Sequence, residues 1–119
     1  MSCLFNSLHY FIPWLSAQEI RNKICDYLEA NEPVIDGIET SVLLGLDGSS
    51  EDYLQKMRQP SEWGGAIEIQ AACNIWKTGI VVQNRRGRDN SDIEFLPVKS
   101  AAQSNIAVTW TGGHYEPVK

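Results

Sequence analysis

The sequence predicts an α+β fold in which helices occupy the first two thirds of the chain and strands the last third. Apolar residues repeat at helical spacing after a capping motif at Ser16. The pattern changes period at Thr78–Gly79, and the β-branched run Ile80–Val82 follows directly. Helices followed by strands are typical of α+β domains, and 119 residues suit a single domain.

The first two helices are predicted from their start and stop signals. A short helix covers residues 3–10, with Ser2 as its cap, and ends before Pro13. The second helix begins at Ser16, which forms a capping box with Glu19 and is followed by an apolar stripe. The stripe is formed by Ala17, Ile20, Ile24 and Leu28, and the opposite, polar face by Arg21, Asn22, Lys23, Asp26 and Glu29.

The rest of the chain is predicted in the same way. Residues 34–48 show no clear period. Acidic residues after Ser49 indicate a helix that ends before Pro60, and an apolar stripe predicts another helix over 66–76. Two further strands are predicted over 93–96 and 106–110, and a tight turn at 112–113 precedes a last strand with His114.

Composition limits the partners. The net charge is -5, which disfavours binding to nucleic acid, and the basic cluster Arg85, Arg86 and Arg88 lies in a predicted turn. No apolar run approaches the ~20 residues of a membrane span. An odd number of cysteines, without a Cys-x-x-Cys pair or a secretory signal, favours free thiols in a reducing compartment. We therefore expect a cytoplasmic monomer that binds neither nucleic acid nor membrane.

Cys3 and His114 are the candidates for catalysis. A cysteine nucleophile acts as the thiolate, which backbone N–H groups at a helix N-terminus and a nearby imidazolium stabilise. Cys3 starts the first predicted helix, and His114 follows Gly112–Gly113 near the last strand. Glu116 is two residues further on, so on a strand it shares a face with His114 and is the candidate to orient the imidazole.

Structural roles remain alternatives for these residues. A lone cysteine at a helix start is often a small buried hydrophobe, and a histidine after Gly-Gly is often a surface residue. Cys25 and Cys73 fall on or beside apolar stripes, which favours core packing. The spacings of the cysteines and histidines match no metal-ligand pair, so we expect neither a metal nor another cofactor.

Three segments in order resemble the ovarian tumour (OTU) family of cysteine peptidases. Residues 2–8 read Ser-Cys-Leu-Phe-Asn-Ser-Leu, similar to the family's nucleophile motif Asp-Gly-Asn-Cys-Leu-Phe-x-Ala/Ser-Leu. Residues 63–71 read Trp-Gly-Gly-Ala-Ile-Glu-Ile-Gln-Ala, similar to Trp-Gly-Gly-x-x-Glu-Leu-x-Ala. Residues 106–110 and 113–118 resemble the terminal strand and its His-Tyr motif. The resemblance covers essentially the whole chain.

The resemblance implies a papain-like fold, with a small, mostly antiparallel sheet flanked by helices. It implies hydrolysis of isopeptide bonds to ubiquitin or a ubiquitin-like protein, with Cys3 as nucleophile and His114 as base. The modifier's tail carries arginines and ends in Gly-Gly, which suits an acidic domain and needs a narrow channel. We expect that channel to be formed by Trp63, Gly64, Gly65 and Tyr115.

The sequence departs from the family pattern at two positions. Only Met1 and Ser2 precede Cys3, so we expect a single domain over 1–119 that lacks the usual segment before the nucleophile. Glu116 stands where the family commonly has Asp or Asn. Two other functions remain open: an impaired OTU-like domain that binds ubiquitin or another partner without cleaving it, and a viral polyprotein protease. For a viral or effector protein, the compartment is the host cytosol.

Overall fold

The computed structural model describes residues 3–46, 48–85, 91–98 and 100–119. The predicted cap Ser2 and the basic residues Arg86 and Arg88 lie outside these ranges. The helices are α1 (Cys3–Phe11), α2 (Ala17–Glu29), α3 (Thr40–Leu44), α4 (Ser50–Met57) and α5 (Ala66–Trp76). The strands are β1 (Thr78–Asn84), β2 (Ser91–Phe95), β3 (Ser104–Trp110) and β4 (Tyr115–Pro117).

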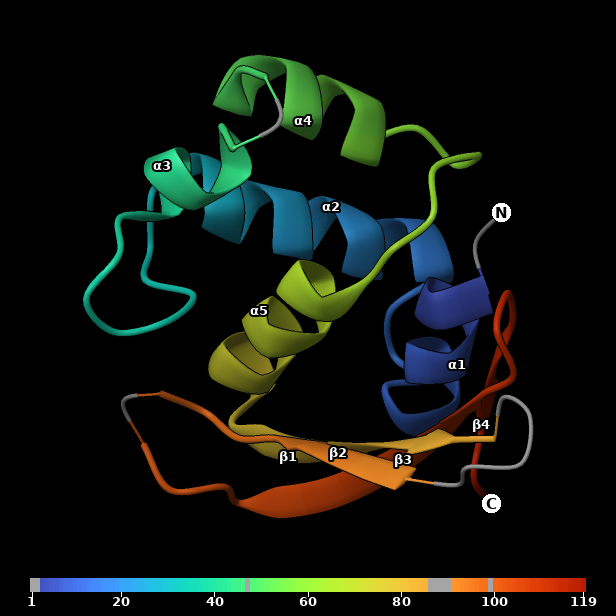
Figure 1. Cartoon of the computed structure of the whole chain (residues 1–119). Helices are drawn as coiled ribbons and strands as arrows, with labels where there is room; N and C mark the ends of the chain where they lie inside the picture. The colour runs from blue at the N-terminus through green and yellow to red at the C-terminus, as the bar shows by residue number, and fades with distance from the viewer. Residues whose placement is uncertain (1–2, 47, 86–90, 99) are drawn as a thin grey trace.

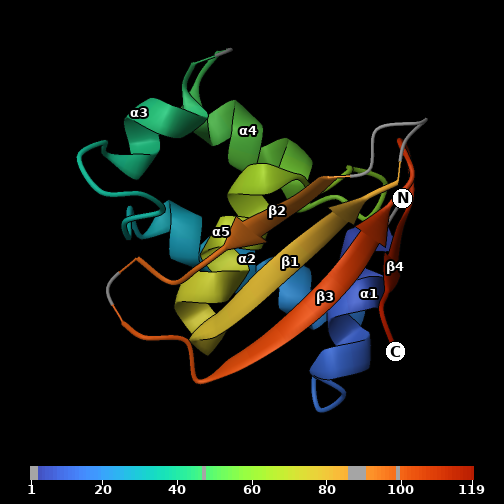
Figure 2. The same ribbon diagram turned by 60° about the horizontal axis from the view of Figure 1, so that its bottom comes forward.

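The described elements form layers on one side of a single sheet (Figure 1). Helices α1 and α5 lie directly on the sheet, α2 crosses above them, and α3 and α4 form the outermost layer. The strands are ordered β2-β1-β3-β4, as Figure 2 shows. β1 pairs antiparallel with β2 and parallel with β3, and β3 pairs antiparallel with β4. The predicted α+β class with a mostly antiparallel sheet is therefore confirmed.

Local signals account for the start of α2 and for the change from α5 to β1. The Ser16 hydroxyl accepts a hydrogen bond from the Glu19 amide, and Glu19 Oε1 accepts one from the Ser16 amide, both at 3.1 Å. This is the predicted capping box. α5 ends at Lys77, whose φ of 53° is left-handed, and β1 follows at once. Ile80 and Val82 on β1 are buried beneath α5.

A contiguous apolar core lies between the sheet and the helices. Phe5 and Leu8 from α1, Ile24 from α2, Ile69 from α5 and Val108 from β3 are all buried. Packing of α1 and α5 against the strands fixes the N-terminal turns of both helices relative to the sheet, which matters for the site described below.

Arg21 corrects one prediction about α2. It was assigned to the polar face of the helix, but its side chain is completely buried. Its guanidinium donates to the carbonyls of Met57 (2.7 Å), Pro60 (3.3 Å) and Glu62 (2.8 Å), so the charge is well solvated by the backbone. Arg21 lies four and seven residues before Cys25 and Leu28, which are both buried, so all three residues face the interior of the molecule.

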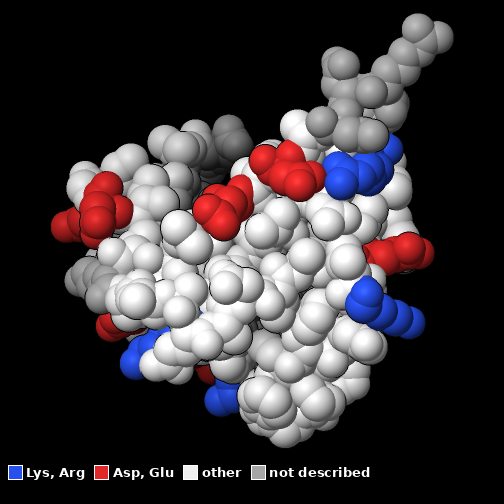
Figure 3. Space-filling view, turned by 90° about the horizontal axis from the view of Figure 1, so that it is seen from below, with Lys and Arg blue, Asp and Glu red and all other residues white. Residues whose placement is uncertain are grey.

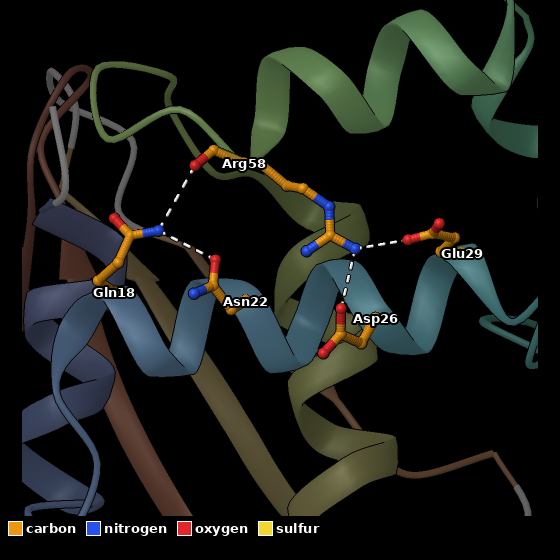
Figure 4. Close-up of polar contacts among 5 residues, drawn as sticks. All are labelled: Gln18, Asn22, Asp26, Glu29 and Arg58. Carbon is orange, nitrogen blue, oxygen red and sulfur yellow. Dashed lines mark hydrogen bonds and ion pairs between the residues drawn. The ribbon is translucent and has the colours of Figure 1, made fainter.

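Exposed polar contacts join α2 to the end of α4 (Figure 4). Arg58 donates to Asp26 at 2.8 Å and to Glu29 at 2.6 Å, and the Gln18 amide donates to the Arg58 carbonyl at 3.4 Å. These contacts connect the outer helical layer to the middle layer. No helix among the described residues is long and apolar enough to cross a membrane.

Candidate active site

Cys3 is the first residue of α1 and is half-buried. The next two residues, Leu4 and Phe5, are buried in the core, which fixes the start of the helix against the molecule. The buried Ser7 hydroxyl donates to the Cys3 carbonyl at 2.8 Å, one turn along the helix. The first turn of α1 therefore presents the Cys3 thiol from a well-packed position at a helix N-terminus.

His114 lies at the end of a tight turn after β3. The Thr111 amide donates to the His114 carbonyl at 3.2 Å, and Gly112 has a φ of +100°, a conformation that favours glycine. The sequence had suggested that His114 lies on the last strand. In the structure it lies one residue before β4. The turn therefore places His114 at the N-terminal end of β4.

Glu116 contacts the His114 ring. His114 Nε2 lies 3.3 Å from Glu116 Oε1, with 52% of the histidine side chain and 69% of the glutamate side chain exposed. Because water screens such an exposed pair, the contact contributes little to the stability of the fold. Its main effect is to orient the His114 ring. The contact occupies Nε2 and leaves Nδ1 as the nitrogen available to a thiol.

The start of α1 and the His114 turn lie at the same end of the molecule. α1 packs against β4, and both views show the N-terminal end of α1 beside the segment that leads into β4 (Figures 1 and 2). Burial, followed by the nearby charges of Cys3 and Glu68, raises the pKa of Tyr115. Tyr115, the neighbour of His114, belongs to β4, which packs against the helix that begins at Cys3.

Residues 63–65 approach both halves of this region. A Cβ atom placed on Gly64 would lie 2.6 Å from Leu4 Cδ2 and 3.0 Å from Phe5 Cζ, so glycine permits close packing against α1. A Cβ atom on Gly113 would lie 3.6 Å from two carbons of the Trp63 indole, which places that ring over the His114 turn. Half of Trp63 remains exposed.

A small apolar hollow of about 160 Å³ adjoins the turn. Ala66 and Ile69 of α5 form one wall, and Val82, Trp110 and Tyr115 of the sheet form the other. Trp110 and Tyr115 pair across β3 and β4, so both rings lie on the same face of the sheet. The hollow is large enough for one aliphatic side chain. One of its lining residues, Tyr115, directly follows His114 in the sequence.

The remaining cysteines lie in the core, as predicted. Cys25 and Cys73 are completely buried, and burial raises their pKa values to about 11 and about 12. Neither thiol is accessible or ionised at neutral pH. Among the described residues, no group of three or more His, Cys, Asp or Glu side chains is placed to hold a metal ion.

Sequence reasoning missed two buried polar residues behind the site. Glu68 belongs to the quoted 63–71 motif but was given no role, and its side chain is 1% exposed. Arg21 lies over the Phe5 ring, with its guanidinium carbon 4.1 Å from the ring centroid. For Glu68, the available signal was its position three residues after Gly65, the spacing of a capping carboxylate.

The family model for OTU-like cysteine proteases matches residues 2–115. The chain belongs to this family. Ubiquitin thioesterase otu2 of Schizosaccharomyces pombe is a relative with 31% identity over 91 residues, which cover 72% of the chain and 30% of that protein. The chain spans about a third of the length of the curated relatives it matches.

Solved OTU domains share the fold. The OTUD1 OTU domain superposes with a TM-score of 0.76 at 17% sequence identity, covering 98% of the chain and 77% of that structure. An OTU domain solved in complex with ubiquitin superposes with a TM-score of 0.72 at 22% identity, covering 98% of the chain and 62% of that structure. The arrangement of helices and sheet is therefore that of an OTU domain.

Proposed function

We propose that the chain is a thiol-dependent deubiquitinase that hydrolyses isopeptide bonds to ubiquitin or a ubiquitin-like protein. In this proposal Cys3 is the nucleophile, His114 the general base and acid, and Glu116 the group that orients the imidazole. The observation on which it rests is the 3.3 Å contact between His114 Nε2 and Glu116 Oε1 of β4, the strand that packs against the helix beginning at Cys3.

Membership of a cysteine protease family supports this proposal. A relative is named a ubiquitin thioesterase, and a structural neighbour was solved in complex with ubiquitin, which supports ubiquitin as the partner. The burial of Cys25 and Cys73 supports Cys3 as the nucleophile, since Cys3 is the more accessible thiol.

The proposed reaction has two stages. His114 takes the Cys3 proton, and the thiolate attacks the carbonyl carbon of the modifier's C-terminal glycine. The imidazolium then protonates the leaving lysine amine, the C–N bond breaks, and a thioester to Cys3 remains. His114 next removes a proton from water, which attacks the thioester, and the free carboxylate and the Cys3 thiol are regenerated.

The modifier's tail is proposed to reach Cys3 along residues 63–65 and Tyr115. A Cβ atom on Gly65 would meet only Glu68 Oε1, at 3.9 Å, so an extended tail could lie close to the backbone at this position, and the Trp63 ring covers the His114 turn. The hollow of about 160 Å³ beside Tyr115 offers a place for an aliphatic side chain of that tail. These contacts would exclude water from the scissile bond.

The decisive experiment uses ubiquitin carrying a C-terminal electrophile. The wild-type chain is expected to form a covalent adduct one ubiquitin heavier, read by mass spectrometry, and Cys3→Ala is expected to form none. Cys25→Ala and Cys73→Ala are matched controls that remove a buried thiol and should still be labelled. Circular dichroism of all variants checks that the fold is retained.

Other results would point elsewhere. An adduct on Cys3→Ala would exclude Cys3 as the nucleophile. Tight binding of unmodified ubiquitin by a wild-type chain that forms no adduct would identify the impaired, binding-only domain instead. Absence of both adduct and binding, with the fold intact, would reject ubiquitin as the partner.

A further inference from the structure

A buried carboxylate lies directly behind residues 63–65. Glu68 is 1% exposed, and its Oε1 accepts a hydrogen bond from the Gly65 amide at 2.7 Å. Its Oε2 accepts the hydroxyl hydrogen bond of Tyr53, which comes from α4. Burial raises the pKa of the Glu68 carboxyl, and the hydrogen bonds from Tyr53 and the Gly65 amide act in the opposite direction. Glu68 therefore joins α4, α5 and the Gly65 backbone at one point.

Arg21 holds the segment that leads into residues 63–65 from its N-terminal side. Its guanidinium binds the carbonyls of Met57, the last residue of α4, and of Pro60 and Glu62, which lie between α4 and Trp63. The guanidinium also stacks on Phe5, two residues after Cys3. The loop that leads into Trp63 is thus fixed to α2 and to α1, and its other end is fixed by Glu68.

The segment held in this way contacts the neighbours of both proposed catalytic residues. Gly64 packs against Leu4 and Phe5, directly after Cys3, and the Trp63 indole lies against Gly113, directly before His114. A displacement of residues 63–65 would therefore change the packing of the nucleophile's helix and of the histidine's turn together.

We propose that Glu68 is a positioning residue, which with Tyr53 holds residues 63–65 so that this segment sets the separation of the Cys3 thiol and the His114 ring. The inference rests on the proposed function for its turnover measurements. Glu68 does not touch the substrate or the reacting atoms; it acts through the Gly65 backbone. In this proposal, loosening the segment increases the distance between the thiol and the imidazole, so the thiolate is less stabilised.

Three variants remove different parts of this hydrogen-bonded connection and are expected to lower kcat to different degrees. Glu68→Leu removes both hydrogen bonds and should lower kcat by about tenfold or more, because a misplacement of ~1 Å can cost ~10²-fold. Tyr53→Phe removes only the hydroxyl contact, keeps the ring, and should lower kcat by roughly threefold to tenfold. Glu68→Gln retains an acceptor for the Gly65 amide and should restore most of the activity.

Tyr27→Phe is the matched control. The Tyr27 hydroxyl donates to the Pro33 carbonyl at 2.6 Å, so this variant also removes a hydrogen bond from a partly buried phenol. It lies on α2 and its partner lies in the 32–39 loop, away from residues 63–65. It should lower stability to a similar degree as Tyr53→Phe and leave kcat unchanged.

Alkylation of Cys3 by a small neutral electrophile, measured from pH 5 to pH 10, separates positioning from other roles. We expect the profiles of Glu68→Leu and Tyr53→Phe to move to higher pH, with KM for the ubiquitin substrate unchanged. A rise in KM with an unmoved profile would mean that residues 63–65 only bind substrate. A lowered melting temperature with an unmoved profile would mean that Glu68 is merely structural. Either result overturns the proposal.

The alkylation profile needs no ubiquitin, so the two proposals fail in different ways. A wild-type chain that is inert to ubiquitin, with a profile that still shifts in Glu68→Leu, would leave the positioning role and reject the substrate. An active wild-type chain with identical profiles in all variants would leave the substrate and reject the positioning role. If Glu68→Leu does not fold, the comparison of Tyr53→Phe with Tyr27→Phe decides.

Discussion

The contact between His114 and Glu116 joins two side chains that are both largely open to solvent. An exposed pair contributes about 0–1 kcal/mol to the free energy of unfolding, so this contact does little to stabilise the fold. Its geometric effect is larger, because it holds Nε2 and thereby limits the rotation of the ring. Glutamate also has one more methylene than aspartate, which gives the carboxylate more freedom than the family's shorter side chain allows.

Glu116→Ala should therefore slow turnover without eliminating it. An acid–base residue contributes about 10²–10⁴-fold, and a group that only orients it contributes less, so we expect a loss of roughly tenfold in kcat. Glu116→Gln, which can still accept a hydrogen bond from the ring, should lose less. Steady-state hydrolysis of a fluorogenic ubiquitin substrate measures the effect.

Glu94→Ala is the control for Glu116→Ala. Glu94 is an exposed acid on β2 and, like Glu116, it belongs to the sheet, so its removal changes the net charge equally. Its rate should equal that of the parent. A rate for Glu116→Ala that also equals the parent's would assign the orienting role to another residue.

Individual residues were predictable where their role follows from local spacing. Glu116 could be paired with His114 because it lies two positions further along the chain, and Cys25 and Cys73 could be assigned to the core from the apolar stripes. The burial of Arg21 could not be predicted, because it depends on hydrogen bonds to three backbone carbonyls far along the chain, those of Met57, Pro60 and Glu62.

Exposed ion pairs connect the C-terminal end of helix α4 to α2. Arg58 binds Asp26 and Glu29, which lie three residues apart on one face of α2 (Figure 4). One guanidinium held by two carboxylates loses less side-chain entropy per contact than two separate pairs would. All three side chains are nevertheless partly or largely exposed, which limits the gain.

Arg58→Gln should lower the free energy of unfolding by about 1 kcal/mol or less. The loss should shrink at 1 M salt, where the Debye length falls to about 3 Å. Urea unfolding at low and high salt measures both effects. Arg85→Gln is the control: it breaks a single exposed pair with Asp92 at 3.1 Å, at the sheet edge, and should cost less than Arg58→Gln at low salt. Equal costs for the two variants would mean that the double contact adds nothing.

Most elements were predictable because their signals are local. The capping box fixed the start of α2, and the change of period after α5 located β1. α3 was not predicted, because its short sequence has no repeating pattern and depends on tertiary contacts. The Thr40 hydroxyl donates to the Glu32 carbonyl and accepts from the Val34 amide at 3.3 Å, so the 32–40 loop folds back onto α3.

The arrangement of the whole sheet brings together parts that the sequence keeps apart. β3 lies between β1 and β4, and the short β4 packs beside α1, which carries the start of the chain to the end of the last strand. Local patterns do not encode this order, since parallel pairing of β1 with β3 and the packing of α1 depend on the complete core. The closeness of the Cys3 and His114 regions was expected from the family resemblance, not from periodicity.

The open face of the sheet has few charges at its centre. Val81, Gln83, Ala107 and Thr109 share this face by register, and Figure 3 shows uncharged side chains in the middle with acidic and basic groups toward the rim. On the face that Figure 3 shows, the acidic side chains are therefore not gathered at the centre. The net negative charge of the chain therefore acts on a partner mainly through a long-range electrostatic field.

That field predicts a dependence of turnover on salt. With a net charge of -5, the chain should attract a modifier whose tail carries arginines, and the attraction should weaken as ions screen it. Between 0.01 M and 0.15 M ionic strength the Debye length falls from about 30 Å to about 8 Å, so kcat/KM should fall several-fold through KM, with kcat unchanged. Alkylation of Cys3 by a neutral electrophile is the control, because an uncharged reagent is not steered. A kcat/KM that stays constant or rises with salt would show that the acidic charge plays no part in recognition.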